Sequence, residues 1–234
     1  MNSKKKQKKF NYHKRFSFKY FIFDFVKWTG FLPTILFFRP KKYFISDKAK
    51  HNQNSGVFIA SNHIGFTDPI LAHAIFLRKR LWIYALKNLF NTKLKRWFFT
   101  RVNAIEVDRE NFNLNTYRQT KELIEAGKNI CIFWEGRITH NIGSKIEDTK
   151  TGVAFMAMIN KAPIIPVMMI PKKHWYERSK MVIGEQIMLS EIYSSTPTQK
   201  EILLATEYLK EKSNELLDYY NSINQERRQN DKSK

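Results

Sequence analysis

The sequence predicts an α/β domain whose mostly parallel sheet is flanked by helices. Apolar runs of strand length lie at 57–60, 81–85, 104–107 and 129–134. Segments between them, at 70–77, 87–100 and 113–126, carry apolar residues at helical spacing, and strands that alternate with helices favour a parallel sheet. With 234 residues, the chain is long enough for one sizeable core.

The second half of the chain continues the alternation. A helix is expected over 150–160, followed by an apolar run at 162–170. Because Pro163 and Pro166 lie in that run, we expect a strand at an edge of the sheet or with irregular ends. A last strand over 180–189 precedes a long amphipathic helix that begins at Pro197-Thr198 and is expected to reach about residue 224.

Composition divides the chain into four parts. Residues 1–15 form a basic arm expected to be disordered, 16–45 an aromatic helical segment, 46–224 the α/β domain and 225–234 a polar basic tail. Pro33 is expected to break or restart the helix of the second part. The longest uncharged run there, 28–38, is too short to span a bilayer.

The segment 16–45 has two interpretations. It could be a helical hairpin that caps the domain core. We favour an interfacial membrane segment, whose aromatic side chains enter the bilayer while flanking Lys and Arg contact anionic headgroups, because so many Phe are otherwise hard to justify. The apolar face of 87–100 is by default part of the core, although it could also contact a membrane or guide a hydrocarbon chain.

The net charge of +20 and the pI near 9.9 indicate a polyanionic partner, such as nucleic acid, anionic lipid, a phosphorylated substrate or an acidic protein. A nucleic-acid-binding protein would concentrate its basic residues around a recognition element. Here the densest charge lies in the terminal arms beside an aromatic helix, so no nucleic acid is expected. The single cysteine, Cys131, excludes an intramolecular disulfide and indicates a reduced compartment. No zinc-type Cys/His cluster or nucleotide phosphate loop occurs in the sequence, and no metal is expected.

The strongest candidate for chemistry is the loop Ser61-Asn62-His63-Ile64-Gly65-Phe66-Thr67-Asp68-Pro69. Its His63 and Asp68 are five residues apart, so the loop can fold back and join them by a hydrogen bond. Asp68 would then fix the tautomer of His63 and leave the other ring nitrogen to take a proton. Without a serine partner, the nucleophile would be a substrate hydroxyl. Alternatively, Asp68 is a helix N-cap before Pro69 and His63 is an ordinary loop residue.

Two more polar groups follow predicted strands. Arg109 comes after 104–107, and Glu135-Gly136-Arg137 comes after 129–134. Because the carboxyl ends of parallel strands meet at one edge of a sheet, we expect these residues near His63. Each arginine alone could be a structural ion-pair partner. Together, a base and two arginines, which bind phosphate bidentately, suit acyl or phosphoryl transfer involving a phosphorylated alcohol.

Four motifs in this order resemble those of the glycerolipid acyltransferase family typified by 1-acyl-glycerol-3-phosphate acyltransferase. The motifs lie at Asn62–Pro69, Ala104–Arg109, Phe133–Arg137 and Ala162–Val167. The sequence departs from the family pattern at Trp134, where proline is usual, at Ala104, where glycine is common, and at Arg137, which follows Gly136 directly. The run 135–139, and Gly143–Ile146 further on, resemble the acyltransferase half of 2-acylglycerophosphoethanolamine acyltransferase.

The resemblance implies a membrane-associated enzyme that moves an acyl group from acyl-CoA or acyl-acyl carrier protein to the free hydroxyl of a lysophospholipid. The expected acceptor is 1-acyl-sn-glycerol 3-phosphate, with a lysophosphatidylethanolamine-type acceptor as the alternative. It further implies that His63 is the base, that Asp68 orients it and that Arg109 and Arg137 bind the phosphate, with Glu135 and Gly136 shaping that loop. No cofactor is implied. The expected location is the cytoplasmic face of a membrane, on anionic lipid.

Overall fold

The computed structural model describes residues 18–51, 55–76, 79–108, 113–136, 138, 146, 149–172, 174, 176–194 and 196–232. These residues form seven strands in one sheet, in the order β1-β7-β6-β2-β5-β3-β4. The strands are β1 (Lys41–Phe44), β2 (Phe58–Ser61), β3 (Leu81–Leu86), β4 (Ala104–Val107), β5 (Asn129–Phe133), β6 (Ile164–Ile170) and β7 (Lys180–Ile183). All neighbouring strands pair in parallel except β6 and β7. The predicted α/β fold with a mostly parallel sheet is confirmed.

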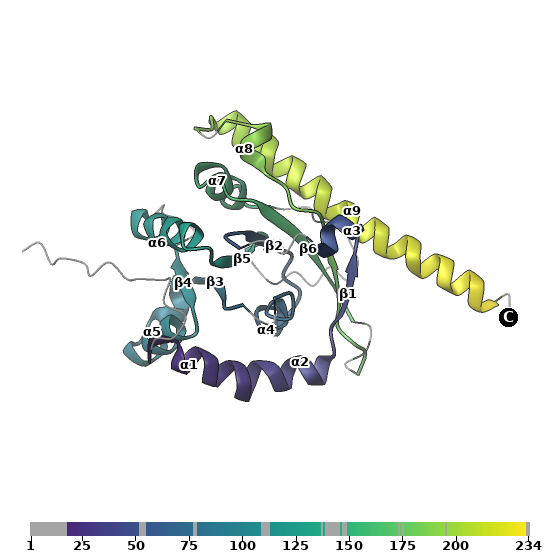
Figure 1. Ribbon diagram of the computed structural model, residues 1–234, viewed down its shortest axis with the longest axis horizontal. Helices are drawn as coiled ribbons and strands as arrows, with labels where there is room; N and C mark the ends of the chain where they lie inside the picture. Colours follow the sequence, from purple (N-terminus) through teal and green to yellow (C-terminus); the bar gives the residue numbers. More distant parts are fainter. Residues whose placement is uncertain are drawn as a thin grey trace, which may run out of the picture.

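Helices cover both faces of the sheet (Figure 1). In the described part of the chain they are α1 (Phe18–Val26), the π-helix η1 (Lys27–Phe31), α2 (Leu32–Phe38), α3 (Asp47–His51), α4 (Asp68–Ala72), the 3-10 helix η2 (Lys87–Phe90), α5 (Lys93–Arg101), α6 (Leu114–Glu125), α7 (Gly152–Ile159), α8 (Leu189–Ile192) and α9 (Gln199–Lys232). Alternate residues of the central strands enter two different cores. In β2, Phe58 and Ala60 pack with α7 and α9, whereas Ile59 packs with α2 and α4. Burial on both faces explains why these strands read as continuous apolar runs.

The strand β6 lies in the middle of the sheet, so the edge alternative is wrong, whereas the interrupted pairing near its beginning fits the irregular-end alternative. It pairs with β2 on one side and with β7 on the other. Pro166 is tolerated because it lies between an isolated bridge at Ile164 and the β7 ladder, which begins at Val167. A ladder hydrogen bond is therefore not required of its missing N–H group. A Cβ atom on Gly184 would lie 2.7 Å from the Pro166 ring, so glycine is needed opposite this proline.

The N-terminal segment forms one continuous helix, α1–η1–α2, which we call the N-terminal helix. The backbone stays in the right-handed helical region at Val26, Phe31 and Leu32, so the break expected at Pro33 and the hairpin interpretation are both wrong. A π-helical turn precedes Pro33, and its wider spacing accommodates the proline ring and its missing N–H group. Residues Tyr20–Phe38 are long and apolar enough to cross a membrane by length and composition.

Three other elements differ from expectation. The edge strand β1 carries Lys41 and Lys42, lacks an apolar run and escapes detection from sequence; its pairing with β7 makes residues before 46 part of the sheet. The strand expected over 180–189 ends at Ile183. The last helix, α9, begins where expected, with a reciprocal cap between Thr198 and Glu201, and runs to Lys232, past the expected end near residue 224.

Candidate active site

The carboxyl end of β2 places the loop that contains His63. Residue Ser61 is in register with Phe133 of β5 and with Val167 of β6, so the loop leaves the sheet between two buried strands. The side chain of Asn62 then continues the pairing toward β6. Its Nδ2 donates to the Met169 carbonyl at 3.0 Å, and its Oδ1 accepts from the Met169 N–H at 2.7 Å. These two bonds fix the chain immediately before His63.

The hydrogen bond expected between His63 and Asp68 is present. The Nδ1 atom of His63 lies 2.9 Å from Oδ2 of Asp68. Because an ionised carboxylate only accepts hydrogen bonds, Nδ1 is the donor, and Nε2 is the nitrogen that can take a proton. The Asp68 side chain is nearly buried, with 4% of its surface exposed, whereas 18% of the His63 side chain is exposed.

The carboxylate of Asp68 also organises the loop itself. Its Oδ2 accepts from the backbone N–H of Ile64 at 2.6 Å and from that of Gly65 at 2.8 Å. The N-cap interpretation is wrong, because Thr67 is the N-cap residue of α4 and Asp68 is its first helical residue. The carboxylate points back into the preceding loop rather than capping its own helix. Three donors to one buried oxygen fix the positions of the carboxylate and of the loop around it.

Strand β5 supplies the surroundings of this pair. The ring of Phe133 stacks on the His63 imidazole, with centroids 4.4 Å apart and planes 24° apart, which restricts rotation of the imidazole. On the same face of β5, two residues before Phe133, Cys131 is fully buried; burial raises the pKa of its thiol, and the Asp68 charge raises it further. Cys131 is therefore a neutral packing residue.

Glu135 and Gly136 follow β5 directly, beside the end of β2. Glu135 is buried, and Gly136 adopts φ 70° while its N–H donates to the Phe133 carbonyl at 3.1 Å. The left-handed backbone explains the glycine, since a side chain there would be strained. Trp134, which stands where the family has proline, turns its indole into the core, and its backbone N–H donates to the Ser61 carbonyl at 3.2 Å.

Arg109 and Arg137 lie outside the described residues. Their positions in the chain are nevertheless informative. Arg137 follows Gly136, one strand away from His63, whereas Arg109 follows the end of β4, three strands away from β2 in the sheet order. At a spacing of about 4.8 Å between strands, the ends of β2 and β4 are about 14 Å apart.

Sequence reasoning missed three contributors to the site: the Asn62 side chain, the stacked Phe133 ring and the backbone N–H groups that bind Asp68. The position of Asn62 immediately after a strand is a signal for the first, since an amide can extend strand pairing. Nothing in the sequence indicates the other two. No group of three His, Cys, Asp or Glu side chains that could hold a metal ion occurs among the residues the structure describes.

Comparison with known proteins agrees with this geometry. Residues 42–170 match the model of the family described as Acyltransferase, a range that contains all four motifs. Two curated relatives are 1-acyl-sn-glycerol-3-phosphate acyltransferases. The one from Bacillus subtilis (strain 168) is 28% identical over 168 residues, covering 70% of this chain and 82% of the relative. The one from Streptococcus pneumoniae (strain ATCC BAA-255 / R6) is 24% identical over 146 residues, covering 60% and 53%.

A solved structure has the same fold. The crystal structure of the 1-acyl-sn-glycerophosphate (LPA) acyltransferase PlsC from Thermotoga maritima superposes with a TM-score of 0.54 at 18% identity, covering 83% of this chain and 78% of that one. The family model spans more than half of the chain and includes the paired His63 and Asp68. The protein belongs to the acyltransferase family.

Proposed function

We propose that the protein is a membrane-associated 1-acyl-sn-glycerol-3-phosphate acyltransferase. It transfers a fatty acyl group from a thioester donor, acyl-CoA or acyl-acyl carrier protein, to the free hydroxyl of the acceptor, and phosphatidic acid results. The observation that carries this proposal is the bond between His63 Nδ1 and the buried Asp68 carboxylate, which leaves Nε2 as the base. The activity named for both curated relatives supports the choice of substrate.

The chemistry is direct transfer between substrates. As the acceptor oxygen attacks the thioester carbonyl, its proton passes to Nε2 of His63. Asp68 stabilises the resulting imidazolium through Nδ1–H. The tetrahedral intermediate collapses, the C–S bond breaks, and the imidazolium returns its proton to the leaving thiolate. One ester and one thiol are formed, and the enzyme is unchanged.

The acceptor phosphate is assigned to Arg137 and Arg109. Arg137 follows the Gly136 turn, at the end of the strand beside β2, which favours it as the nearer ligand. Arginine suits this role because its guanidinium binds phosphate oxygens in pairs. Replacing Arg137 by Ala is expected to raise the KM for the acceptor more than it lowers kcat. Equal acceptor kinetics in the variant and the wild type would remove Arg137 from the site.

The N-terminal helix is assigned to the membrane surface rather than to a transmembrane span. Near one end, Tyr20 packs on Trp82, and Asp24 forms a bidentate ion pair with Arg80; near the other end, Ile35 is buried. A helix held at both ends lies along the domain, as Figure 1 shows, and cannot cross a bilayer without drawing the domain in.

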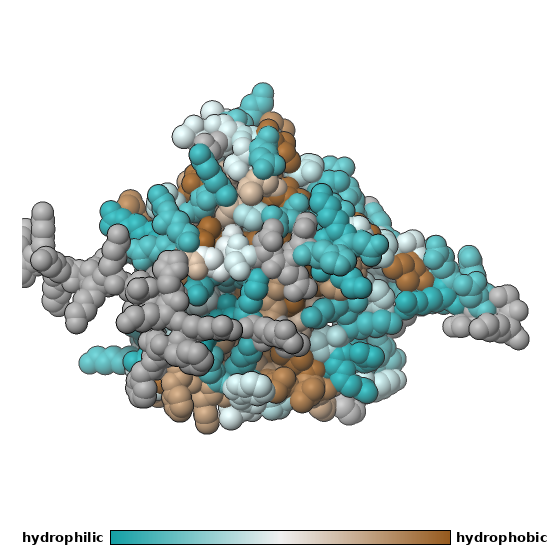
Figure 2. Space-filling view, in the orientation of Figure 1, coloured by the Kyte–Doolittle hydropathy of each residue, from teal (hydrophilic) through white to brown (hydrophobic). Residues whose placement is uncertain are grey.

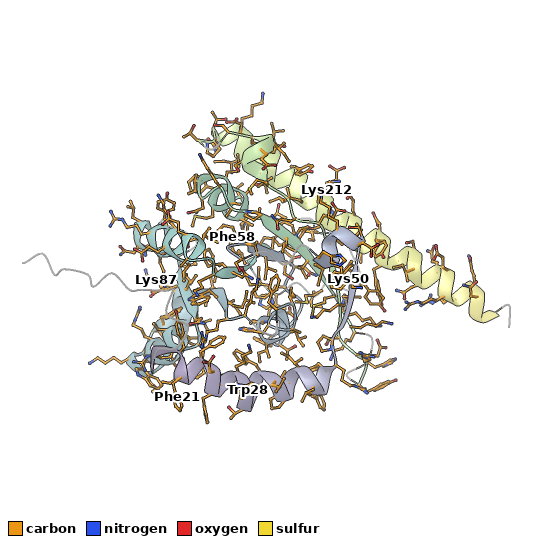
Figure 3. The ribbon with its side chains drawn as sticks, viewed as in Figure 1. Phe21, Trp28, Lys50, Phe58, Lys87 and Lys212 are labelled. Atoms are coloured by element: carbon orange, nitrogen blue, oxygen red, sulfur yellow. The ribbon has the colours of Figure 1, made fainter. Side chains whose placement is uncertain are left out.

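The outer face of the N-terminal helix is apolar. It consists of exposed Phe21, Phe25, Trp28, Leu36 and Phe37. Brown, hydrophobic residues gather at the same lower edge in Figure 2, and Figure 3 labels Phe21 and Trp28 on the helix that forms this edge. Such a face, with a basic protein behind it, suits a helix lying in the interface of an anionic membrane. Membrane attachment on the cytoplasmic face follows as part of the proposal.

An acceptor panel tests the proposal. Purified protein is incubated with an acyl thioester and with lysophosphatidate, lysophosphatidylethanolamine or lysophosphatidylglycerol, and each lipid product is identified by mass. We expect phosphatidic acid to form fastest. A preference for lysophosphatidylethanolamine would favour the second candidate, a lysophospholipid reacylating enzyme, which the sequence of residues 135–139 resembles. No product with any acceptor would contradict both.

A further inference from the structure

Helix α5 is unlike the other crossover helices of the sheet. It connects β3 to β4 through residues Lys93–Arg101, yet none of its residues is buried. The next crossover helix, α6, buries Thr120 and Leu123. On α5, Leu94 is 75% exposed, Trp97 48% and Phe98 40%. The expectation that the apolar face of 87–100 belongs to the core is confirmed for Phe90, which is buried, and wrong for Leu94, Trp97 and Phe98, which need another partner.

The exposed apolar residues form one stripe. Leu94, Trp97 and Phe98 recur at the i, i+3 and i+4 positions that share a face of a helix, and Arg101 continues it. The Arg101 guanidinium lies 5.1 Å from the centroid of the Trp97 ring. We call Leu94, Trp97 and Phe98 the α5 stripe.

The charges around the α5 stripe are of one sign. Helix α5 has four basic residues and no acidic ones. Arg96 is paired with Glu106, whereas Lys93, Lys95 and Arg101 form no ion pair with a carboxylate that the structure describes. An apolar stripe bordered by uncompensated cations complements an anionic lipid surface better than it complements another basic copy of this chain.

Helix α5 lies next to the first part of the N-terminal helix. Helix α5 contacts α1, and Figure 1 shows it beside the beginning of α1 at the lower edge of the view. On the outer face of the N-terminal helix, the part nearest to α5 carries Phe21 and Phe25, whose ring centroids lie 6.5 Å apart. The α5 stripe and the apolar face of the N-terminal helix therefore lie on two helices that contact each other.

We propose that α5 is a second membrane-binding element, which docks on the same anionic phospholipid leaflet as the N-terminal helix. The α5 stripe enters the boundary between headgroups and acyl chains, and Lys93 and Lys95 contact headgroup phosphates. A single helix in the membrane plane leaves the domain free to roll about the helix axis. A second contact beside that axis removes this freedom and fixes the height of His63 above the leaflet. This inference rests on the proposed function, which places a lipid acceptor at His63.

Vesicle binding tests the proposal with the full chain. Partitioning is measured by flotation with vesicles of phosphatidylcholine alone and with vesicles containing phosphatidylglycerol. Lys93→Gln with Lys95→Gln is expected to weaken binding to the anionic vesicles about 30-fold, with little change on neutral ones. The matched control, Arg118→Gln with Lys121→Gln on the exposed side of α6, removes the same charge and is expected to change binding less than about 3-fold. Equal losses in the two pairs would show a net-charge effect and overturn the proposal.

A probe of polarity tests the stripe itself. Leu94→Cys is labelled with an environment-sensitive dye, with Lys121→Cys as the control; the native Cys131 is buried and should not react. On anionic vesicles, the emission from position 94 is expected to shift to the blue, and that from position 121 to stay unchanged. No shift at position 94, or the same shift in a protein dimer without lipid, would overturn the proposal.

Activity separates this inference from the proposed function. With a short-chain acceptor dissolved as monomers, the Lys93 and Lys95 variants are expected to match the wild type, and to lose rate on acceptor held in vesicles. If the wild type acylates no lysophospholipid, the proposed function fails while vesicle binding still reports on α5. If the wild type acylates a lysophospholipid but the α5 variants bind vesicles as tightly as it does, only the role of α5 is contradicted, and the proposed function stands.

Discussion

The buried polar side chains of the loop that carries His63 find their partners within the chain, whereas the side chains on the outer face of the N-terminal helix are exposed. The loop is polar and enclosed: Asp68 accepts three hydrogen bonds, and Asn62 pairs with the backbone of Met169. The helix face is apolar and open, with 67% of Trp28 exposed. One region is complete within the chain and acts on a substrate, whereas the other requires a partner outside it. Substitutions should therefore separate turnover from membrane binding.

The largest effect is expected at the base. The His63→Ala variant removes the group that takes the acceptor proton, so kcat should fall on the order of 10²–10⁴-fold. Binding to anionic vesicles should not change, because His63 is not part of the exposed apolar face of the N-terminal helix. Turnover near the wild-type value in purified His63→Ala would contradict the mechanism.

A smaller loss of turnover is expected at the orienting carboxylate. Asp68→Asn keeps the size of the side chain but cannot stabilise an imidazolium, so kcat should lose part of the about 10²–10⁴-fold that general-base catalysis contributes. Because an amide oxygen can still accept from the N–H groups of Ile64 and Gly65, the fold should be retained. Circular dichroism and steady-state kinetics check both expectations. If Asp68→Asn unfolds, and turnover falls only in proportion to the unfolded fraction, the role of Asp68 is structural alone.

The helix face should show the reverse pattern. Phe25→Ser with Trp28→Ser removes two exposed aromatic side chains, whose partial burial in lipid is worth about 1 kcal/mol each, so vesicle binding should weaken about 30-fold. Turnover of a monomeric acceptor should stay at the wild-type value. The control pair, Leu203→Ser with Leu204→Ser, removes exposed apolar residues from α9 and should not affect vesicle binding.

The smallest effect is expected in the pH dependence of stability, and it involves His73, which packs between α4 and the N-terminal helix. His73, just after α4, is buried against Phe23 and Phe31 of the N-terminal helix. Burial lowers its pKa to about 4; the hydrogen bond to the Pro69 carbonyl opposes this shift, and the nearby Lys27 charge contributes to it. Since the unfolded histidine has a pKa near 6.5, the unfolded state binds more protons between these values, and stability is lost as the pH falls through that window.

We expect the free energy of unfolding to decrease by about 2 kcal/mol from about pH 7.5 to about pH 5 because of His73. Urea titrations of the wild type and of His73→Phe measure this. The variant should lose the dependence, whereas a control at exposed His51, His51→Gln, should keep it. The same pH dependence in His73→Phe and in the wild type would assign it to other groups.

The sequence predicted the positions of β2 to β7 and the His63–Asp68 contact, because the signals for both are local, but it missed β1. The run 104–107 is β4 itself, and the loop contact needs only a five-residue return. Expectations failed where distant parts of the chain decide. From its prolines, β6 could be an edge strand or a strand with irregular ends, and only its pairing with β2 and β7 places it in the centre, with a gap in the β7 pairing at Pro166. The exposure of α5 depends on what covers it, which no pattern within α5 reveals.

The central claim is that His63 activates a hydroxyl of the substrate and that the enzyme supplies no nucleophile of its own. It is tested by mixing the enzyme with acyl thioester in the absence of acceptor, and by following thiol release and the intact mass of the protein. We predict no burst of thiol and no acylated protein until lysophosphatidate is added, after which thiol and phosphatidic acid appear in equal amounts. A burst equal to the enzyme concentration, with an acyl group on the protein, would contradict the account.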